Sequence, residues 1–450
     1  MSSRLVARLI PAAGVGYEVG GAVEDQIGTP LPAGFRLYRG ADLQCAGPRQ
    51  LTEPFDAIPV LPDRARYRGE PVAVLVGPTW AEVDFLATEI PQRRGVQPIE
   101  EEEPSDESAT AWYDSSEGEE PSATPTPSDS ADPAGPADPA GPADPQPAVD
   151  TSASPEPAPE KSSPAAVLTP QVVEGQYATA LQLHIADEAL WAQAEAVRKG
   201  AQVSVPTQWP AIVRGSIAKI LRVNARSVAL EVQPTAGSRD AALWMPAYLS
   251  VIAAALARIE NQPVTVALRS DQRYLTGGRS PARITWSSRL DAEGMLVANQ
   301  VGITVDLGAY PSLTDETGRR VRRAVQSIYR EHPLQYTVSL RTSPSLPMGA
   351  MEGVGSAQVA YAREVHYNRL AELAQEDPIL WRRRHVRGDW PVLDEILGSV
   401  ADESDFHRRH AANELVRKRR IQLPRNSQSL RGIGCAVAEQ ISGLTGEKEL

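Results

Sequence analysis

One segment of the sequence cannot form a packed core, and it divides the chain in two. From Glu100 to Pro164 the sequence consists mainly of Pro, Ala, Ser, Asp and Glu, and it repeats ADPAGP. Such a composition buries too little apolar surface to offset the entropy lost on folding. We therefore expect residues 100–165 to be a disordered acidic linker, with Ala111-Trp112-Tyr113 as its one apolar cluster. An interaction tail held within the chain is the alternative.

The linker also carries the negative charge of the protein. From Glu100 to Glu160 there are 17 acidic residues and no Lys or Arg, whereas the formal net charge of the whole chain is −12. The rest of the sequence is therefore mildly basic. It lacks the concentrated basic face that a nucleic-acid-binding protein shows, so we expect no nucleic-acid partner.

Cysteine usage and hydropathy limit the remaining classes. The chain has two cysteines, Cys45 and Cys435, too few for a disulfide framework or for a zinc or iron–sulfur site built from cysteines. A single long-range disulfide is one option, and a reduced cytoplasmic chain is the one we expect. No apolar run reaches 18 residues and no apolar signal-peptide core follows the N-terminus, so we expect neither a membrane span nor a secretory signal.

Local patterns predict interleaved strands and helices on both sides of the linker. Residues 71–77 are typical of a strand, and the helix that follows begins near Thr79, an N-cap with Glu82 as its capping-box partner. After the linker, we expect an amphipathic helix in residues 211–223, a long buried helix in 241–262 and two paired strands around residues 291–294. Residues 186–200 fit either a helix or a strand and turn. The predicted fold class is mixed α+β.

A glycine-rich turn precedes another predicted helix, in residues 359–378. The turn reads MGAMEGVGSAQ over residues 348–358. Backbone N–H groups at such a turn can face an anion. Glu352, in the middle of the turn, has the wrong charge for that role.

Several stretches together resemble one protein family, the molybdenum hydroxylases, which include xanthine dehydrogenase and aldehyde oxidase. RYRGEPVAVLVGPTWAEVDFLATEI resembles the strand and helix of their a/b hammerhead domain. The stretches VEGQYATALQLH, VSVPTQWPAIVRG, NQPVTVALRSDQRYLTGGRSPARI, DAEGMLVANQVGITVDLGAY, MGAMEGVGSAQ and RGIGCAVAEQ are similar to motifs of the molybdopterin-binding subunit. These matches run in the family's order from about Leu51 to Gly443, with the linker as an interruption.

The resemblance implies a domain organisation. Residues 1–99 would be an N-terminal segment with the a/b hammerhead domain. Residues 166–450 would be the first half of a molybdopterin-binding domain. It also implies an oxidoreductase that hydroxylates a heterocycle or an aldehyde with oxygen from water, with molybdopterin as cofactor and with iron–sulfur and FAD chains as partners.

The resemblance also implies site residues. Gln208 matches the glutamine whose side-chain amide lies close to the molybdenum oxo group, and Gly353, Gly355 and Gln358 match the cofactor loop. We therefore expect these four residues to bind the cofactor. His184 and Glu188 match a further motif pair, and a structural role is the interpretation we favour for them. No catalytic residue and no protein ligand to the metal is assigned.

Three departures from the family pattern weaken the expected chemistry. The family's glycine-rich loop is replaced here by PTAGSRDAAL, residues 234–243, and the loop arginine of the family by Glu352. A carboxylate would repel the anionic cofactor where a planar cation suits it. The family's remaining half, which carries the catalytic glutamate that acts as a base, has no counterpart after residue 450.

Three interpretations therefore stay open. The chain is a divergent, half-length cofactor-binding subunit that pairs with a chain carrying the missing half, and is not catalytic alone. Alternatively, it is a non-catalytic structural or interaction protein derived from that fold. The third option is a gene fragment without a stable role. The basic stretch RRRHVRGDW, from Arg382, is expected to be a solvated helix end.

Overall fold

The computed structural model describes most of the chain outside the expected linker. Glu352, residues 236–242 of the loop 234–243 and all of the linker except residues 107–113 lie outside the described residues. The described residues are 4–15, 17–18, 31–43, 45, 47–90, 92–94, 107–113, 171–184, 188–235, 243–326, 329, 333–348, 353–386, 390–420 and 432–439.

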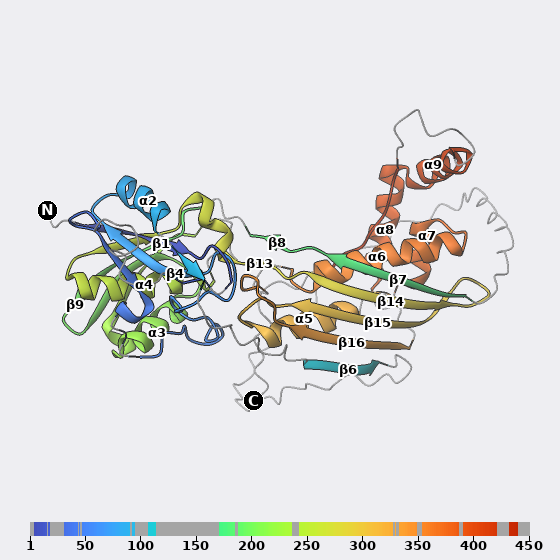
Figure 1. The fold of residues 1–450 in the computed structure, drawn as a ribbon. Coiled ribbons are helices and arrows are strands. Elements are labelled where there is room, and N and C mark those ends of the chain that lie inside the picture. The colour runs from blue at the N-terminus through green and yellow to red at the C-terminus, as the bar shows by residue number, and fades with distance from the viewer. Residues whose placement is uncertain are drawn as a thin grey trace, which may run out of the picture.

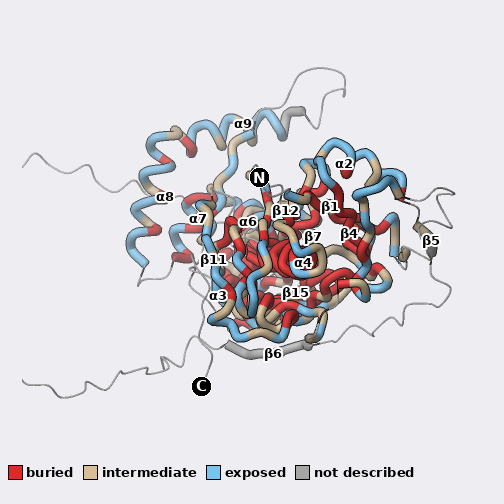
Figure 2. Tube along the Cα trace, turned by 90° about the vertical axis from the view of Figure 1, so that its left-hand side faces the viewer, coloured by how far each residue is buried: buried red, intermediate tan, exposed pale blue. Residues whose placement is uncertain are grey.

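Two lobes lie side by side, and each is built on one sheet covered by helices (Figure 1). The first lobe holds a seven-stranded sheet in the order β11-β10-β9-β12-β1-β4-β3, and the second a five-stranded sheet in the order β6-β16-β15-β14-β7. The fold is therefore mixed α+β, as the sequence predicts. Buried residues fill the interior of both lobes, whereas helices α8 and α9 at the rim are mostly exposed (Figure 2).

Strands from both sides of the linker share the sheet of the first lobe. β1 pairs in parallel with β12 and antiparallel with β4, so the strands of residues 1–99 continue the sheet formed after the linker. Within the stretch that fits either helix or strand, residues 191–197 form β9, which pairs with β10 as a hairpin. The strands are β1 (Leu5–Pro11), β3 (Arg36–Arg39), β4 (Pro71–Gly77), β9 (Trp191–Val197), β10 (Gly200–Pro206), β11 (Val228–Gln233) and β12 (Val264–Ala267).

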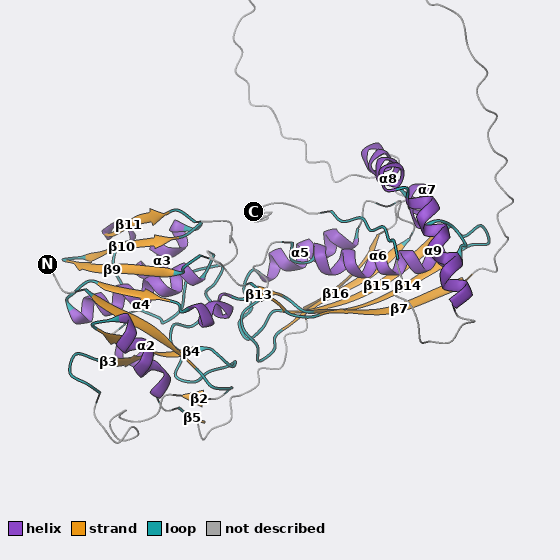
Figure 3. Cartoon of the chain, turned by 90° about the horizontal axis from the view of Figure 1, so that it is seen from above, coloured by secondary structure: helices purple, strands orange, loops and turns teal. Residues whose placement is uncertain are grey.

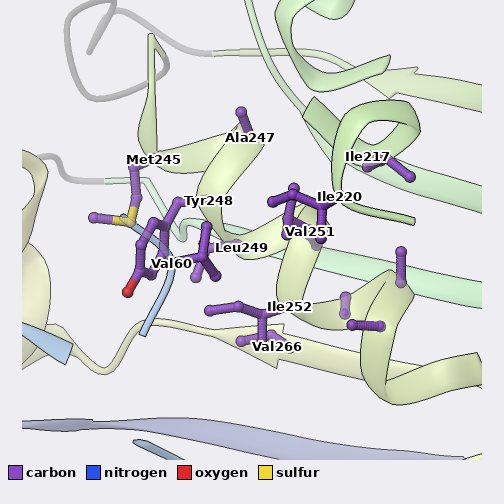
Figure 4. Packing of buried hydrophobic residues seen from close by; sticks show 14 of the residues in the cluster. Val60, Ile217, Ile220, Met245, Ala247, Tyr248, Leu249, Val251, Ile252 and Val266 are labelled. Atoms are coloured by element: carbon purple, nitrogen blue, oxygen red, sulfur yellow. The ribbon is translucent and has the colours of Figure 1, made fainter. Parts of the chain in front are cut away.

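Helices cover both faces of this sheet. The long apolar helix α4 (Met245–Glu260) is buried from Met245 to Ala257 and packs with α3 (Pro210–Leu221) against the strands (Figure 4). On the opposite face, α2 (Trp80–Glu89) packs on β1 and β4. The N-cap prediction is confirmed, because the Thr79 hydroxyl accepts a hydrogen bond from the Glu82 backbone N–H.

The second lobe is a sheet with helices on one face. Its strands alternate between buried and exposed residues, as in β14, so one face meets the core and the other meets solvent. Helices α5 (Thr314–Val325) and α6 (Ser356–Leu373) cover the buried face (Figure 3). The strands are β7 (Gln171–Thr179), β14 (Ala282–Leu290), β15 (Leu296–Asp306), β16 (Leu334–Arg341) and β6 (Glu107–Tyr113), and β14 and β15 form the predicted hairpin.

Part of the expected linker is ordered, which corrects the prediction of disorder for residues 107–113. Glu107–Tyr113 forms strand β6 and pairs antiparallel with β16 along its whole length. The pairing includes the apolar cluster Ala111-Trp112-Tyr113. Trp112 and Tyr113 favour a strand, and the pairing of β6 covers the edge of the sheet that β16 would otherwise leave open. This pairing is non-local, which is why composition alone does not reveal it.

A buried charge cluster joins helix α7 to the second lobe and corrects part of a second prediction, because Arg383 and Arg384 are exposed at the helix end as expected but Arg382 is not. Arg382, expected to be solvated, is fully buried, and its Nε donates to Oε2 of Glu364 at 2.9 Å. Arg363 donates to the other oxygen of Glu364, and the backbone N–H of Val437 to Oε2. The extended segment 432–439 is therefore held against α6. The outer helices are α7 (Pro378–His385), α8 (Pro391–Ser404) and α9 (Phe406–Arg420).

Short strands complete the structure. β8 (Gln182–Leu183) and β13 (Gly278–Arg279) pair where the chain passes between the two lobes, and β2 (Tyr17–Glu18) pairs with β5 (Arg93–Arg94). Cys45 and Cys435 are free thiols. None of the helices within the described ranges is long and apolar enough to cross a membrane.

Candidate functional site

The predicted cofactor turn is a tight backbone turn at the start of α6. Gly353 and Gly355 have φ angles of +73° and +84°, a region that L side chains rarely adopt. A Cβ atom on Gly355 would lie 2.8 Å from the backbone nitrogen of Val321 in α5. Glycine at position 355 therefore lets α5 and the start of α6 approach closely.

Gln358 holds this turn in place from inside. Its side chain is 2% exposed; Oε1 accepts a hydrogen bond from the Gly355 N–H at 2.9 Å, and Nε2 donates to the Ser280 carbonyl at 2.9 Å. Both ends of the amide are thus bonded to backbone. In this arrangement Gln358 fixes the turn against the residue that follows β13.

A guanidinium group lies beside the turn. A Cβ atom on Gly353 would stand 3.7 Å from Nη2 of Arg279, in β13. Nη1 of Arg279 donates to Oε1 of Gln182 in the paired strand β8 at 2.7 Å, so the guanidinium is oriented by the ladder. Arginine presents a planar cation that suits phosphate and carboxylate groups.

Two buried polar atoms flank the same ladder. Nε2 of His184, which follows β8, and Oγ of Ser280, which follows β13, are buried and have no hydrogen-bond partner within the described part of the chain. The backbone around His184 is held firmly, since its N–H donates to Gly277 and its carbonyl accepts from the Thr276 hydroxyl. A buried polar atom without a partner costs about 1–3 kcal/mol, so such a place favours a polar ligand or water.

Gln208 lies in the other lobe, after β10 and before α3. Its neighbourhood is a short turn in which the Trp209 N–H bonds to the Thr207 hydroxyl at 3.0 Å. β10 and β11 are parallel, and their carboxyl ends point toward the second lobe (Figure 3). The structure brings Gly353, Gly355 and Gln358 together at one turn, and among the described residues no hydrogen bond joins Gln208 to them.

Tyr310 and Glu70 form a direct contact between the two lobes. Tyr310, in the loop between β15 and α5, is 5% exposed and belongs to the hydrophobic core of the first lobe. Its hydroxyl donates to Oε1 of Glu70 at 2.6 Å. Glu70 is 2% exposed, and burial raises its pKa to about 7 despite hydrogen bonds from Tyr310 and from the backbone of Arg66 and Tyr67.

Other polar features of the second lobe are structural or lie elsewhere. His366 is fully buried between the hydroxyls of Tyr177 and Ser288, at 2.8 and 3.0 Å, and burial lowers its pKa to about 4. A shallow polar hollow, lined by residues such as Gln176, Thr285 and Gln335, lies on the sheet face away from the helices. Within the described ranges, no group of three or more His, Cys, Asp or Glu side chains could hold a metal ion.

Sequence reasoning missed Arg279, Glu70 and Tyr310. All three lie within stretches that carry the family resemblance, GGRSPARI, RGEPVAVLVG and DLGAY. An arginine directly after two glycines was the available signal for Arg279. Glu70 and Tyr310 are 240 residues apart in the chain, so no local pattern could pair them.

Comparison with known protein families assigns the part of the chain that holds Gln208, Arg279 and the turn at Gly353–Gly355 to one family. The model of a family described as "Molybdopterin cofactor-binding domain" matches residues 162–386, half of the chain. A protein from Bacillus subtilis (strain 168) that is named as a probable subunit of xanthine dehydrogenase is 27% identical over 179 residues. That alignment covers 39% of this chain and 23% of the relative.

Solved structures agree on the fold. The aldehyde oxidoreductase from Desulfovibrio gigas superposes with a TM-score of 0.64 at 16% identity, over 86% of this chain and 40% of that one. The quinoline 2-oxidoreductase from Pseudomonas putida 86 gives a TM-score of 0.66 at 18% identity, over 92% of this chain and 52% of that one. This chain therefore spans about half of these structures or less, and at such low identity the likeness concerns the fold.

Proposed function

Because the chain belongs to the molybdopterin cofactor-binding domain family of the molybdenum hydroxylases, we propose that it is a cofactor-binding subunit of such an oxidoreductase. In this proposal it binds molybdopterin together with a partner chain and does not hydroxylate a substrate alone. The single observation that carries the proposal is the turn Gly353–Gly355 with the guanidinium of Arg279 beside it.

The residues at the turn fit an anionic, hydrogen-bonding group. Arg279 supplies a cation for the cofactor phosphate, and the unpartnered atoms of His184 and Ser280 are suited to its polar edges. Gly353 and Gly355 add no side chain of their own to the turn. When bound, the cofactor would supply the two-electron redox chemistry of hydroxylation, which this chain's own side chains do not provide.

The remaining expected site residues take supporting roles in the proposal. Gln358 keeps the turn closed through its two backbone hydrogen bonds. Gln208 would direct its amide toward the metal centre from the carboxyl end of β10, in line with the resemblance.

Domain organisation and partners belong to the same proposal. Residues 1–99 are proposed to be the a/b hammerhead domain, supported by the compact core of β1, β4 and α2, and residues 166–450 the molybdopterin-binding part. Residues 100–165 are proposed to link the two parts, with residues 107–113 paired to β16 as strand β6. The partners would be iron–sulfur and FAD chains, or a chain that carries the other half of the site, in the cytoplasm.

The test compares matched variants of the full chain. Arg279→Ala should reduce molybdenum and pterin per chain several-fold while thermal melting stays near that of the wild type, and Arg279→Lys should retain part of both. Glu352→Arg, which restores the family's charge in the turn, should increase both. Unchanged molybdenum and pterin content in Arg279→Ala, measured by elemental analysis and pterin fluorescence, would contradict the proposal.

The second candidate is a non-catalytic structural or interaction protein with the same fold. Glu352 favours it, because a carboxylate in the turn opposes an anionic cofactor, and so does the internal use of both polar groups of Gln358. For this candidate Glu352→Arg leaves molybdenum at background. The same variant therefore separates the two functions.

A further inference from the structure

Tyr310 crosses from one lobe into the core of the other. Its loop, residues 307–313, belongs to the second lobe, yet its ring packs edge-on to Tyr67 with centroids 6.3 Å apart. The Arg66 guanidinium lies 5.4 Å from the centre of the Tyr310 ring. The hydroxyl ends on the carboxyl group of Glu70, at 2.6 Å. Apolar packing, a cation and a hydrogen bond thus fix this one side chain.

Glu70 is held equally firmly on the side of the first lobe. It directly precedes β4, and its Oε2 accepts a hydrogen bond from the Arg66 backbone N–H at 2.6 Å. With Oε1 bonded to Tyr310, each carboxyl oxygen has a partner. The contact therefore joins the second lobe to a buried residue that directly precedes β4.

The loop that carries Tyr310 is bonded to the segment that leads into the cofactor turn. The Ala309 N–H donates to the Ser345 carbonyl at 2.8 Å, and the Met348 N–H donates to the Leu307 carbonyl at 3.1 Å. Gly308 has φ +77°, and a Cβ there would stand only 2.1 Å from the Leu346 carbonyl oxygen. No other residue type could bring the two segments so close.

The same loop also reaches the far side of the turn. Directly after it comes α5, whose backbone at Arg320 and Val321 meets Gly355. Met348 in addition forms a bridge with Gly278, next to Arg279. Contacts therefore link the loop that Tyr310 anchors to residues 343–348 before the turn, to Gly355 at its end and to the strand that carries Arg279.

We propose that Tyr310 is a positioning residue: its contact with Glu70 sets where the turn at Gly353–Gly355 stands relative to the first lobe, the lobe that carries Gln208. This inference rests on the proposed function for its purpose, since a cofactor held between the lobes needs both sides at a fixed distance. Its structural content can be tested without any cofactor.

The experiment measures amide hydrogen exchange in the full-length chain. In Tyr310→Phe the ring stays and the hydrogen bond is lost, so peptides covering residues 343–348 should exchange roughly fivefold faster than in the wild type. Glu70→Gln should accelerate their exchange less than Tyr310→Phe, because its one amide oxygen can still accept from the Tyr310 hydroxyl, whereas its NH2 group replaces the oxygen that accepts from the Arg66 N–H.

Tyr248→Phe is the matched control. Tyr248 is a buried tyrosine of the same core; its hydroxyl accepts from the Leu61 N–H at 3.3 Å and donates to the Pro71 carbonyl at 3.5 Å, so both of its hydrogen bonds lie within the first lobe. It should lower the melting temperature without changing exchange in residues 343–348. Equal acceleration in Tyr248→Phe and Tyr310→Phe, or none in Tyr310→Phe, would overturn the inference.

Molybdenum content of the same samples separates this inference from the proposed function. If the wild type binds molybdenum and Tyr310→Phe binds less with faster exchange, both stand. A wild type with background molybdenum, combined with the expected pattern of exchange, refutes the proposed function and leaves the anchoring role of Tyr310 supported.

Discussion

Replacing Glu70 by Gln should change how the stability of the protein depends on pH. The carboxyl group faces Tyr310, the backbone N–H of Arg66 and a buried aromatic cluster, and burial raises its pKa from 4.5 to about 7. The charged and titratable groups around it are Arg66, Tyr67, Tyr248 and Tyr310. Gln is nearly the same size, keeps an acceptor for Tyr310 and cannot ionise.

The sign follows from proton binding. The folded protein holds the Glu70 proton more tightly than the unfolded chain does. The stability that this proton contributes is therefore fully present below about pH 4.5 and is lost as pH rises through about 7. Each pKa unit corresponds to about 1.4 kcal/mol, which gives about 3 kcal/mol for the full shift. The wild type should therefore lose up to about 3 kcal/mol relative to Glu70→Gln between pH 4.5 and 8.

Urea denaturation of both proteins at pH 5 and pH 8 measures this difference. Glu89→Gln, on the exposed end of α2, serves as the surface control and should show the same pH dependence as the wild type. If the free-energy difference between wild type and Glu70→Gln is the same at both pH values, the carboxyl group is not protonated in the folded protein near neutrality, and the reasoning fails.

Three further predictions concern stability. Glu364→Ala should cost about 3–5 kcal/mol in urea denaturation, because it leaves the buried Arg363 and Arg382 without their shared carboxylate. Gly355→Ala should lower the free energy of unfolding by about 1–3 kcal/mol more than Gly353→Ala, because both positions have a positive φ but only position 355 lacks room for a Cβ. Equal melting temperatures of the two variants would contradict this. Because burial lowers the pKa of His366 from 6.5 to about 4, the wild type should lose up to about 3 kcal/mol of unfolding free energy as pH falls from about 6.5 to 4. His366→Gln should lack this loss, which denaturation at both pH values measures.

Elements with a strong local pattern could be predicted from the sequence. The apolar run of α4, the capping residues of α2 and the turn between β14 and β15 each depend on a few neighbouring residues, and the structure confirms them. Residues 186–200 were ambiguous because their composition suits a helix. Pairing with β10 and β12 favours the strand, a tertiary effect that outweighs local propensity.

Long-range contacts could not be predicted. Strand β6 depends on the free edge of β16, and the burial of Arg382 depends on Glu364, which meets it only after α6 and α7 pack. The glycine turn before α6 could be predicted, because glycines before a helix form a local pattern, and its role in cofactor binding stays a prediction. The position of Arg279 beside it could not be predicted, because the contact joins segments about 70 residues apart.

The most direct test of the central claim is the molybdenum content per chain, measured by elemental analysis on protein purified gently from its native cells. If the turn at Gly353–Gly355, Arg279 and a partner chain hold the cofactor, we expect close to one molybdenum per chain, with pterin in equal amount. Molybdenum at background in protein that is folded and still bound to its partners would contradict the claim.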